Sequence, residues 1–373
     1  MVRGKCCHYL RIAVFLRVDV VVWYRYHFRL QMKNNEITKR PRRGSGAVTL
    51  RDVAKLAGVA PITASRAVNT PDAVSPEVLR KVQEAIDRTG YVPNRMAGGL
   101  ASSRSRLIAA VVPTLLGSVF LEMVESLNNT LFESGYQLML GQSGYSQDHE
   151  EALLDAIIGR RPDGIFLTGI MNPGKGRTRL LASGIPVVET WDLTPTPVDM
   201  LIGFSHAAIG KEVAEYLMRK GHQRFALIQA DDERATRRAT AFMETLAGHG
   251  LGAPVVVNVG GARSIKSGRD ALGKVLAQMS DVQAIFCSSD MLATGAITEA
   301  TSRGIRVPDQ LSVMGFGDVP FVADLIPALT TVHINGGQMG KKAAQYLIAR
   351  AEGNEVEHPI IDVGFSIVER DSA

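Results

Sequence analysis

From Leu107 to the end of the chain, short apolar runs alternate with amphipathic segments, and this alternation constrains the fold more than any other feature. Eight runs have the length and composition of buried strands: LIAAVVP, YQLMLG, DGIFLTG, IPVVET, FALIQA, VVVNVG, AIFCSS and LSVMGF. Helical periodicity lies between them, at 120–133, 208–219 and 235–249. Strands that alternate with helices form parallel sheets covered on both faces. The sequence predicts an α/β body, whose nearly equal halves before and after Gly203 predict two doubly wound subdomains with a cleft between them.

The charge of the chain is unevenly distributed. The formal net charge is +5 over 373 residues, but residues 1–47 carry +9, residues 48–106 carry +4 and the rest carry −8. A basic front on an acidic body predicts that the N-terminal quarter meets an anionic partner, either nucleic acid or a membrane surface. With 46% apolar residues and no short repeat, the chain is neither disordered overall nor a solenoid.

Residues 1–47 are interpreted as a basic extension, disordered or in part an over-called start. Charged residues interrupt the apolar stretch at 10–28, so we expect neither a membrane-spanning helix, which needs about 20 largely uncharged residues, nor a signal peptide. The three cysteines, Cys6, Cys7 and Cys287, form no disulfide framework and no zinc motif. The sequence therefore predicts a cytoplasmic protein that needs no metal and no cofactor.

Three short helices are predicted after this extension. Thr49 and Asp52 read as a capping pair before a first helix, which Gly58 ends. A second helix is expected over 61–68, and a third over 76–89. Two short helices joined by a glycine-containing turn, with a third packed across them, predict a helix-turn-helix whose second helix enters the major groove.

A plain three-helix bundle packed on the body is the alternative interpretation. Ile62, Ser65 and Arg66 project from the second helix on the side away from its apolar positions. The nearby excess of positive charge favours DNA binding over the plain bundle.

The stretch from 48 to 107 resembles the DNA-binding headpiece and hinge of the lactose-repressor family, through VTLRDVAKLAGVAPITASRAVN, then VS, then GYVPNRMAGGLAS. The resemblance continues in GHQRFALI, SSDMLATGA, VPDQLSVMGFGD and the LTTV crossover that begins at Leu329. It implies an all-α helix-turn-helix domain at 48–92, a hinge at 93–106, and an effector-binding and dimerisation body at 107–373 that is similar to periplasmic sugar-binding proteins.

The resemblance also implies the DNA contacts, with Leu100 as a wedge between base steps of a bent operator. The implied contact residues are Thr49, Pro61, Ile62, Thr63, Ser65, Arg66, Asn69, Val74, Asn94, Arg95, Ala97 and Leu100. Pro61 and Ile62 depart from the family, which more often has polar or aromatic residues there. Ile62 is therefore expected to touch a thymine methyl group rather than to read a base by hydrogen bonding.

The motifs of enzymes are absent or incomplete. Residues 169–176 nearly complete a phosphate-binding loop, but Gly176 stands where a Mg²⁺-binding hydroxyl is required, so this segment is interpreted as a flexible surface loop. No nucleophile elbow, GxGxxG or HExxH motif occurs, and the histidines are scattered, His206 among them. The sequence predicts that the chain is not an enzyme.

Effector-binding residues are predicted from the strand ends, where ligands bind in doubly wound sheets. They are Thr114, Phe120, Glu189, Trp191, Arg238, Ser289, Asp290 and Asp318. Aromatic and hydrogen-bonding groups together suit a sugar, and Arg238, which matches an arginine of family effector pockets, suits a carboxylate. Gly317 replaces an acid that sugar-binding members of the family commonly have. The loss of this negative charge favours an anionic ligand.

PVVETWD and the closing DVGFSIVERDS resemble the gluconate-operon repressors of the family. The chain is thus interpreted as a homodimeric repressor that binds a pseudo-palindromic operator and is released by gluconate, a ketogluconate or a related aldonate. Tetramers, the operator sequence and the sign of the effector's action are left open. The alternatives are a purine or neutral-sugar regulator of the same family, and a sugar-binding receptor without DNA binding.

Overall fold

A computed structural model describes most of the chain, which divides into two compact units with a boundary between Gly98 and Gly99. The described residues are 48–92, 104–115, 119–144, 146–261 and 263–373. The basic extension and residues 93–103 of the predicted hinge lie outside them. Within the described ranges, no helix is both long enough and apolar enough to cross a membrane.

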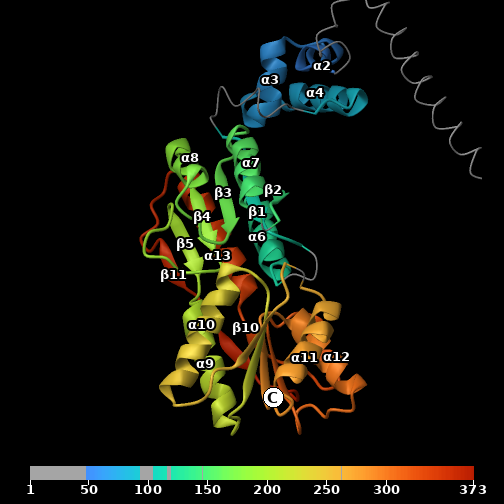
Figure 1. The fold of residues 1–373 in the computed structure, drawn as a ribbon. Helices are drawn as coiled ribbons and strands as arrows, with labels where there is room; N and C mark the ends of the chain where they lie inside the picture. Colours follow the sequence, from blue (N-terminus) through green and yellow to red (C-terminus); the bar gives the residue numbers. More distant parts are fainter. Residues whose placement is uncertain (1–47, 93–103, 116–118, 145, 262) are drawn as a thin grey trace, which may run out of the picture. The chain divides into compact units, whose positions relative to one another are not determined.

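The N-terminal unit is a small helical domain (Figure 1). Its elements are α2 (Leu50–Ala57), α3 (Pro61–Asn69), the 3₁₀ turn η1 (Pro71–Ala73) and α4 (Pro76–Thr89). The predicted caps are present: the Asp52 carboxylate accepts hydrogen bonds from the Thr49 amide at 2.8 Å and the Thr49 hydroxyl at 2.7 Å. Gly58 and Gly90 end their helices at φ 66° and 63°, a conformation that glycine adopts without a steric cost. The core of this unit contains Val53, Ala54, Ala64, Ala67, Val82 and Ala85.

The second unit contains two six-stranded sheets. The strands are β1 (Leu107–Val112), β2 (Gln137–Gln142), β3 (Gly164–Thr168), β4 (Val187–Thr190), β5 (Met200–Gly203), β6 (Phe225–Gln229), β7 (Val255–Asn258), β8 (Ala284–Cys287), β9 (Ser312–Phe316), β10 (Thr330–His333), β11 (Ile360–Asp362) and β12 (Ser366–Val368). The first sheet has the order β11-β5-β4-β3-β1-β2 and the second β12-β10-β9-β8-β6-β7. All neighbours are parallel except β10 and β12. The predicted fold is confirmed.

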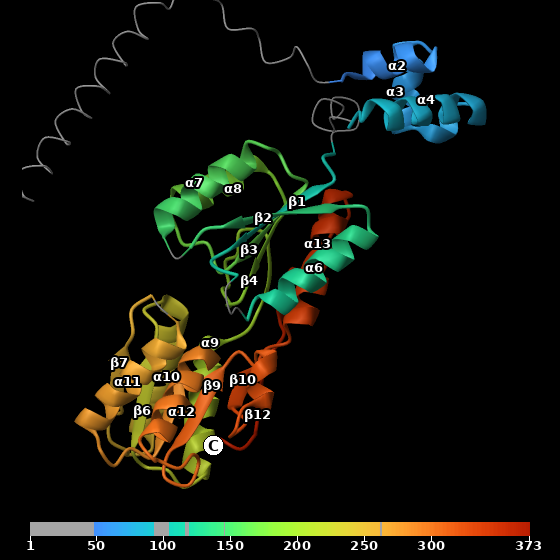
Figure 2. The same ribbon diagram turned by 90° about the vertical axis from the view of Figure 1, so that its right-hand side faces the viewer.

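Helices cover both faces of each sheet, which is why the strands are apolar on both sides. The helices are α6 (Leu121–Glu133), α7 (Gln147–Ile158), α8 (Lys175–Ser183), α9 (His206–Arg219), α10 (Glu233–Gly248), α11 (Ile265–Gln278), α12 (Asp290–Ser302) and α13 (Gly336–Ala351), with η2 (Pro320–Asp324) after β9. Figure 2 shows α6 and α13 side by side on one face of the first sheet, and α7 and α8 on the other. On the second sheet, α9 pairs with α10 and α11 with α12.

The chain passes between the two subdomains three times: after β5, after β10 and after β11. The predicted division at Gly203 is right for the first passage only, because α13 and β11 return to the first sheet. All eight predicted strands form, as β1–β4 and β6–β9. The LTTV segment, predicted as a crossover, instead contributes most of β10, and the passage follows it. One core cluster extends through both subdomains and includes Phe120, Trp191, Phe204 and Phe316.

Glycines allow helices of the same layer to approach closely. An added Cβ at Gly340 of α13 would lie 2.1 Å from the Met123 carbonyl oxygen of α6, and one at Gly210 of α9 would lie 2.1 Å from the Arg238 carbonyl oxygen of α10. Backbone atoms cannot yield as the end of a flexible side chain does. The spacing of both helix pairs therefore depends on these two residues.

Gly340→Ala should destabilise the body by about 1–3 kcal/mol, because the added methyl group overpacks a backbone contact. Urea denaturation of the full chain measures this as a lower midpoint. The control is Gly248→Ala at the end of α10, where no atom lies within 4 Å of the added Cβ. It should be neutral or stabilising by up to about 1 kcal/mol. An unchanged midpoint for Gly340→Ala would refute the close packing of α6 on α13.

Candidate DNA interface and ligand cavity

Helix α3 presents one face to its own domain and another to solvent. Ala64 and Ala67 are buried in the small core, while Ile62, 65% exposed, and Arg66 lie on the outer face. The outer face of α3 thus offers an apolar side chain and a cation side by side to solvent.

A hydrogen bond organises the end of this face. The Asn69 side-chain amide donates to the Ser65 carbonyl oxygen at 3.0 Å and to the Ser65 hydroxyl oxygen at 3.3 Å. Because the Ser65 oxygen accepts this bond, its own proton is directed elsewhere and is available to an external acceptor.

The other predicted DNA contacts fall into three groups. Pro61 is exposed and Thr63 is half-buried on α3. Thr49 is held in the capping pair, and Val74 packs against the small core. The four hinge residues lie outside the described residues; they are Asn94, Arg95, Ala97 and Leu100.

A cavity of about 230 Å³ lies between the two sheets of the body. Its wall comes from segments that follow the carboxyl ends of β1, β4, β5, β6, β7 and β8, and from the end of β9. Five of the eight predicted effector residues line it: Thr114, Phe120, Trp191, Arg238 and Ser289. Val119, His206, Asp232, Arg234, Gly261, Arg263, Ser288, Met291 and Phe316, none of them among the predicted effector residues, line it as well.

Arg238 is the central charged group of the cavity. It lies on the inner face of α10, where its neighbours at helical spacing are Ala235, Ala239 and Phe242. It is 4% exposed, and among the described residues no carboxylate forms an ion pair with it. Its Nη2 donates to the Ser288 carbonyl oxygen at 3.2 Å. Burial lowers the pKa of Arg238 to about 9, so it remains a cation at neutral pH.

His206, at the start of α9, joins Arg238 to the other subdomain. Its Nε2 lies 2.9 Å from the Trp191 carbonyl oxygen, and its Nδ1 lies 2.9 Å from Nη1 of Arg238. A carbonyl only accepts and a guanidinium only donates, so the proton must be on Nε2 and the lone pair on Nδ1. Burial, and then the charge of Arg238, lower the pKa of His206 to about 2. The ring therefore stays neutral at all physiological pH values.

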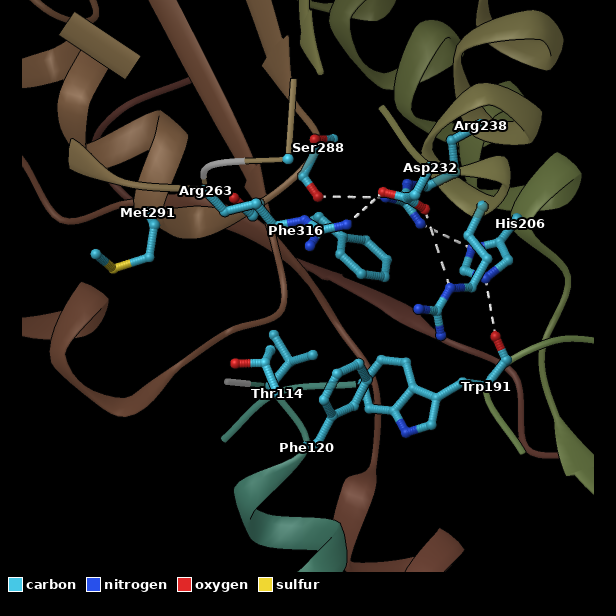
Figure 3. Close-up of a pocket in the computed structure, with 14 residues that line it drawn as sticks. Thr114, Phe120, Trp191, His206, Asp232, Arg238, Arg263, Ser288, Met291 and Phe316 are labelled. Carbon is cyan, nitrogen blue, oxygen red and sulfur yellow. Dashed lines mark hydrogen bonds and ion pairs between the residues drawn. The ribbon is translucent and has the colours of Figure 1, made fainter. Parts of the chain in front are cut away.

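Aromatic rings form the opposite wall, as Figure 3 shows for Phe120 and Trp191. These rings meet edge to face with centroids 4.7 Å apart. The guanidinium carbon of Arg238 lies 3.9 Å from the centroid of the Phe316 ring, a cation–π contact that stabilises the charge without neutralising it. Trp191 has φ 66°, a strained backbone for a bulky residue.

Three guanidinium groups face the cavity against one carboxylate. Asp232 caps α10 by accepting from the Ala235 amide at 3.0 Å and pairs with Arg263 at 2.5 Å. Burial opposes ionisation of Asp232, but these donors and Arg234 outweigh it, and its pKa lies below the usual value. Two donor atoms in this wall, Nε of Arg238 and Nη1 of Arg234, are buried without a hydrogen-bond partner. The cavity thus carries an excess of positive charge and unmet donors, which suits an anionic ligand.

Three predicted effector residues do not line the cavity. Glu189 is fully buried and accepts from the amides of Met171 and Val198, both at 2.6 Å. Asp290, also buried, accepts from the Thr331 hydroxyl at 2.6 Å, and burial raises its pKa to about 6. Both carboxylates are placed to hold loops and strands together rather than to face the cavity.

The third is Asp318, which pairs with Arg370 at 2.7 Å and His333 at 3.0 Å. Its neighbour Gly317 has φ 133°, and an added Cβ would lie 2.3 Å from Cγ1 of Val119 in the other subdomain. A glycine at position 317 therefore has a steric reason as well as the electrostatic one, which is the absence of a negative charge there.

Sequence reasoning missed His206, Asp232, Arg234 and Arg263. The first was interpreted as one of several scattered histidines, and the next two lie at the start of α10, just before the predicted helix start. Arg238 itself was recognisable as a cation within an apolar helical stripe.

In the described part of the chain, no group of three His, Cys, Asp or Glu side chains could hold a metal ion.

Two regions of the chain match known families. Residues 49–94 match the bacterial regulatory proteins of the lacI family, and residues 214–373 match a periplasmic binding protein-like domain. The transcriptional regulator GntR of Pseudomonas aeruginosa is 35% identical over 342 residues, which cover 91% of this chain and 98% of that protein.

Solved structures are similar over the same extent. A LacI-family transcriptional regulator from Silicibacter pomeroyi has a TM-score of 0.82 and 31% identity, covering 87% of this chain and 99% of that one. The Lac repressor dimer bound to operator and the anti-inducer ONPF has a TM-score of 0.75 and 25% identity, covering 87% and 99%.

His206→Gln should weaken the pH dependence of folding, because glutamine keeps one donor and one acceptor but does not titrate. The folded chain holds His206 neutral down to a pKa of about 2, whereas the unfolded chain protonates it near 6.5. Its contribution to stability is therefore present above pH 6.5 and lost as the pH falls from 6.5 towards 2.

Between pH 7.5 and 5.0 the wild type should lose about 2 kcal/mol more unfolding free energy than the variant, at about 1.4 kcal/mol per pH unit below 6.5. Urea denaturation at both pH values measures this. His249→Gln, at an exposed position after α10, is the control and should follow the wild type. Equal pH dependence in wild type and His206→Gln would contradict the buried neutral ring.

Proposed function

Because this chain belongs to the lacI family of bacterial regulatory proteins, we propose that it represses sugar-acid utilisation genes and leaves its operator when gluconate or a ketogluconate enters the cavity between its two sheets. It is a DNA-binding transcriptional regulator and not an enzyme. The relative from Pseudomonas aeruginosa carries the name GntR, and the Lac repressor was solved as a dimer on operator DNA. Both support a homodimeric, cytoplasmic repressor of this kind.

The observation that carries the choice of effector is the buried charge of Arg238. A cation in a mostly apolar wall without a carboxylate partner costs solvation free energy, which only an anion can restore in full. A ligand carboxylate would reach the unmatched Nε together with an Nη in a bidentate pair. A neutral sugar or a purine would leave this charge unbalanced.

The rest of the cavity suits the hydroxylated part of such an acid. Phe120 and Trp191 offer aromatic faces to C–H groups, and Thr114 and Ser289 offer hydroxyl groups. His206 would act as a positioning residue, because its Nδ1 accepts a hydrogen bond from the Arg238 guanidinium and so fixes the orientation of that group. A movement of the Arg238 guanidinium on ligand binding would then be transmitted through the hydrogen bonds of His206 to Trp191, which lies in the other subdomain.

For DNA, we propose that the outer face of α3 reads the major groove. Ile62 would contact a thymine methyl group, Arg66 a guanine or a phosphate, and Ser65 would donate the proton that Asn69 leaves free. Pro61 and Thr63 would contact the backbone near the start of the helix, while Thr49 and Val74 flank this face. Asn94, Arg95, Ala97 and Leu100 stay predicted contacts of the hinge.

Arg66→Ala should weaken operator binding by about 5- to 150-fold, since a base contact of arginine contributes about 1–3 kcal/mol. The operator for this test is a duplex selected from random sequence by the wild-type protein, and affinity is measured by fluorescence anisotropy. Arg88→Ala, exposed on α4, is the control and should bind as the wild type does. Intact affinity in Arg66→Ala would remove this residue from the contacts.

Arg238→Gln should abolish gluconate binding and operator release while leaving operator affinity without gluconate unchanged. Isothermal titration calorimetry with gluconate and 2-ketogluconate measures the first effect, and anisotropy the second. Arg219→Gln, exposed on α9, is the control. Retained operator affinity shows that the variant is folded, so gluconate binding that survives in it would refute the role of Arg238.

A further inference from the structure

A second cavity of about 250 Å³ adjoins the first, and Asp232 and Arg234 line both. It lies at the carboxyl ends of the first sheet's strands, against the start of α10. The segment that nearly matches a phosphate-binding loop forms part of its wall through Gly169–Asn172, Gly174 and Gly176.

Residues 172–175 of that segment are exposed, as expected of a surface loop, whereas Met171 and Gly176 on either side of them are buried. Met171 is 8% exposed, and its amide donates to the fully buried carboxylate of Glu189. An added Cβ at Gly176 would lie 2.6 Å from Cε of Met171. A side chain at position 176 would therefore have to displace the end of the Met171 side chain.

The two cavities have opposite electrostatic character. Three arginines and one carboxylate are the charged groups of the first cavity, whereas the second is lined by the carboxylates of Glu150, Glu151, Asp192 and Glu233 besides the shared Asp232, against Arg234 and Arg237. Arg237 pairs with Asp192 at 2.7 Å and with Glu233 at 2.5 Å. Glu150 forms no ion pair or side-chain hydrogen bond with any described residue, and burial raises its pKa.

Polar atoms without a hydrogen-bond partner lie where the two cavities meet and in the wall of the second cavity. Nη1 of Arg234, at the junction, and the hydroxyl of Thr168, in the second wall, are buried without a partner. Carboxylates and hydroxyls are the groups that bind the hydroxyls of a neutral sugar, and a wall of carboxylates repels an anion. The charge pattern therefore orients a ligand, with its acidic end in the first cavity and a neutral, hydroxylated end in the second.

The volumes of the two cavities also indicate a ligand that occupies both. Cavities of about 230 and 250 Å³ each fall below the roughly 300–1,000 Å³ of typical small-molecule sites, while the two together fall within that range. A six-carbon acid occupies one of them only.

We propose that the second cavity is a subsite for a further sugar unit, so that the preferred effector is an aldonic acid carrying a glycosyl group. Its carboxylate pairs with Arg238, its linking oxygen accepts from Arg234, and hydroxyls of its second unit donate to Glu150. This inference rests on the proposed function, since it extends the same effector site.

The test is isothermal titration calorimetry of the full chain with gluconate and with lactobionate or maltobionate, which are gluconates bearing one hexose. We expect at least tenfold tighter binding of a two-unit acid. Glu150→Gln should lower the affinity for the two-unit acid about tenfold and leave gluconate binding unchanged. Glu133→Gln, exposed at the end of α6, is the matched control and should alter neither.

The possible failures are distinct. If gluconate binds and the two-unit acids bind no more tightly, the second subsite is refuted and the proposed function stands. If Glu150→Gln weakens both classes of ligand equally, the assignment of Glu150 to the second unit is refuted. If none of the acids binds, the sugar-acid function fails together with the subsite.

Discussion

The organisation of the body depends on one buried cation. Arg238 is held by the lone pair of His206, the Ser288 carbonyl oxygen and the Phe316 ring, all neutral groups. Neutral partners satisfy hydrogen bonds but leave the charge uncompensated, so the site keeps its attraction for an anion. The low pKa of the His206 ring is part of this arrangement, because a protonated ring would turn the bond into a repulsion.

Through His206, which follows a passage between subdomains, a movement of the Arg238 guanidinium can be coupled to a movement of one subdomain relative to the other. His206 begins α9 directly after the first passage, and its ring bonds back to Trp191, which follows a strand of the first sheet. A change in the position of the guanidinium is therefore transmitted through two hydrogen bonds to the opposite lobe. The approach of Gly210 to the Arg238 backbone fixes the helix that carries the cation, so that the side chain rather than the helix responds.

The sequence predicted the fold better than the site, for physical reasons. Buried strands have a strong apolar signal, whereas the missed strands β11 and β12 have three residues each and lie at sheet edges. The other two missed strands, β5 and β10, have four residues, as the predicted β4, β7 and β8 do, so length does not explain why they were missed. Reasoning from strand ends brought Phe120, Trp191 and Arg238 together. It also selected Glu189 and Asp290, because an acid that ties a loop to a strand has the same sequence position as one that faces a ligand. Arg234 and Arg263 were missed because their place depends on how α10 and the segment after β7 fold towards the cavity.

Gly317 shows how sterics and charge act together in selecting the ligand. Its φ of 133° is strained for any side chain, and a Cβ there would collide with Val119 across the cleft. An aspartate at this position would hold the two lobes further apart and would also bring a negative charge near the guanidinium groups of the cavity. Removing that side chain thus allows a closer approach of the lobes and leaves Asp232 as the one carboxylate among the described residues that line the first cavity. Under the proposed function, Gly317, which follows Phe316 of the cavity wall, thus favours an acid over a neutral sugar together with Arg238.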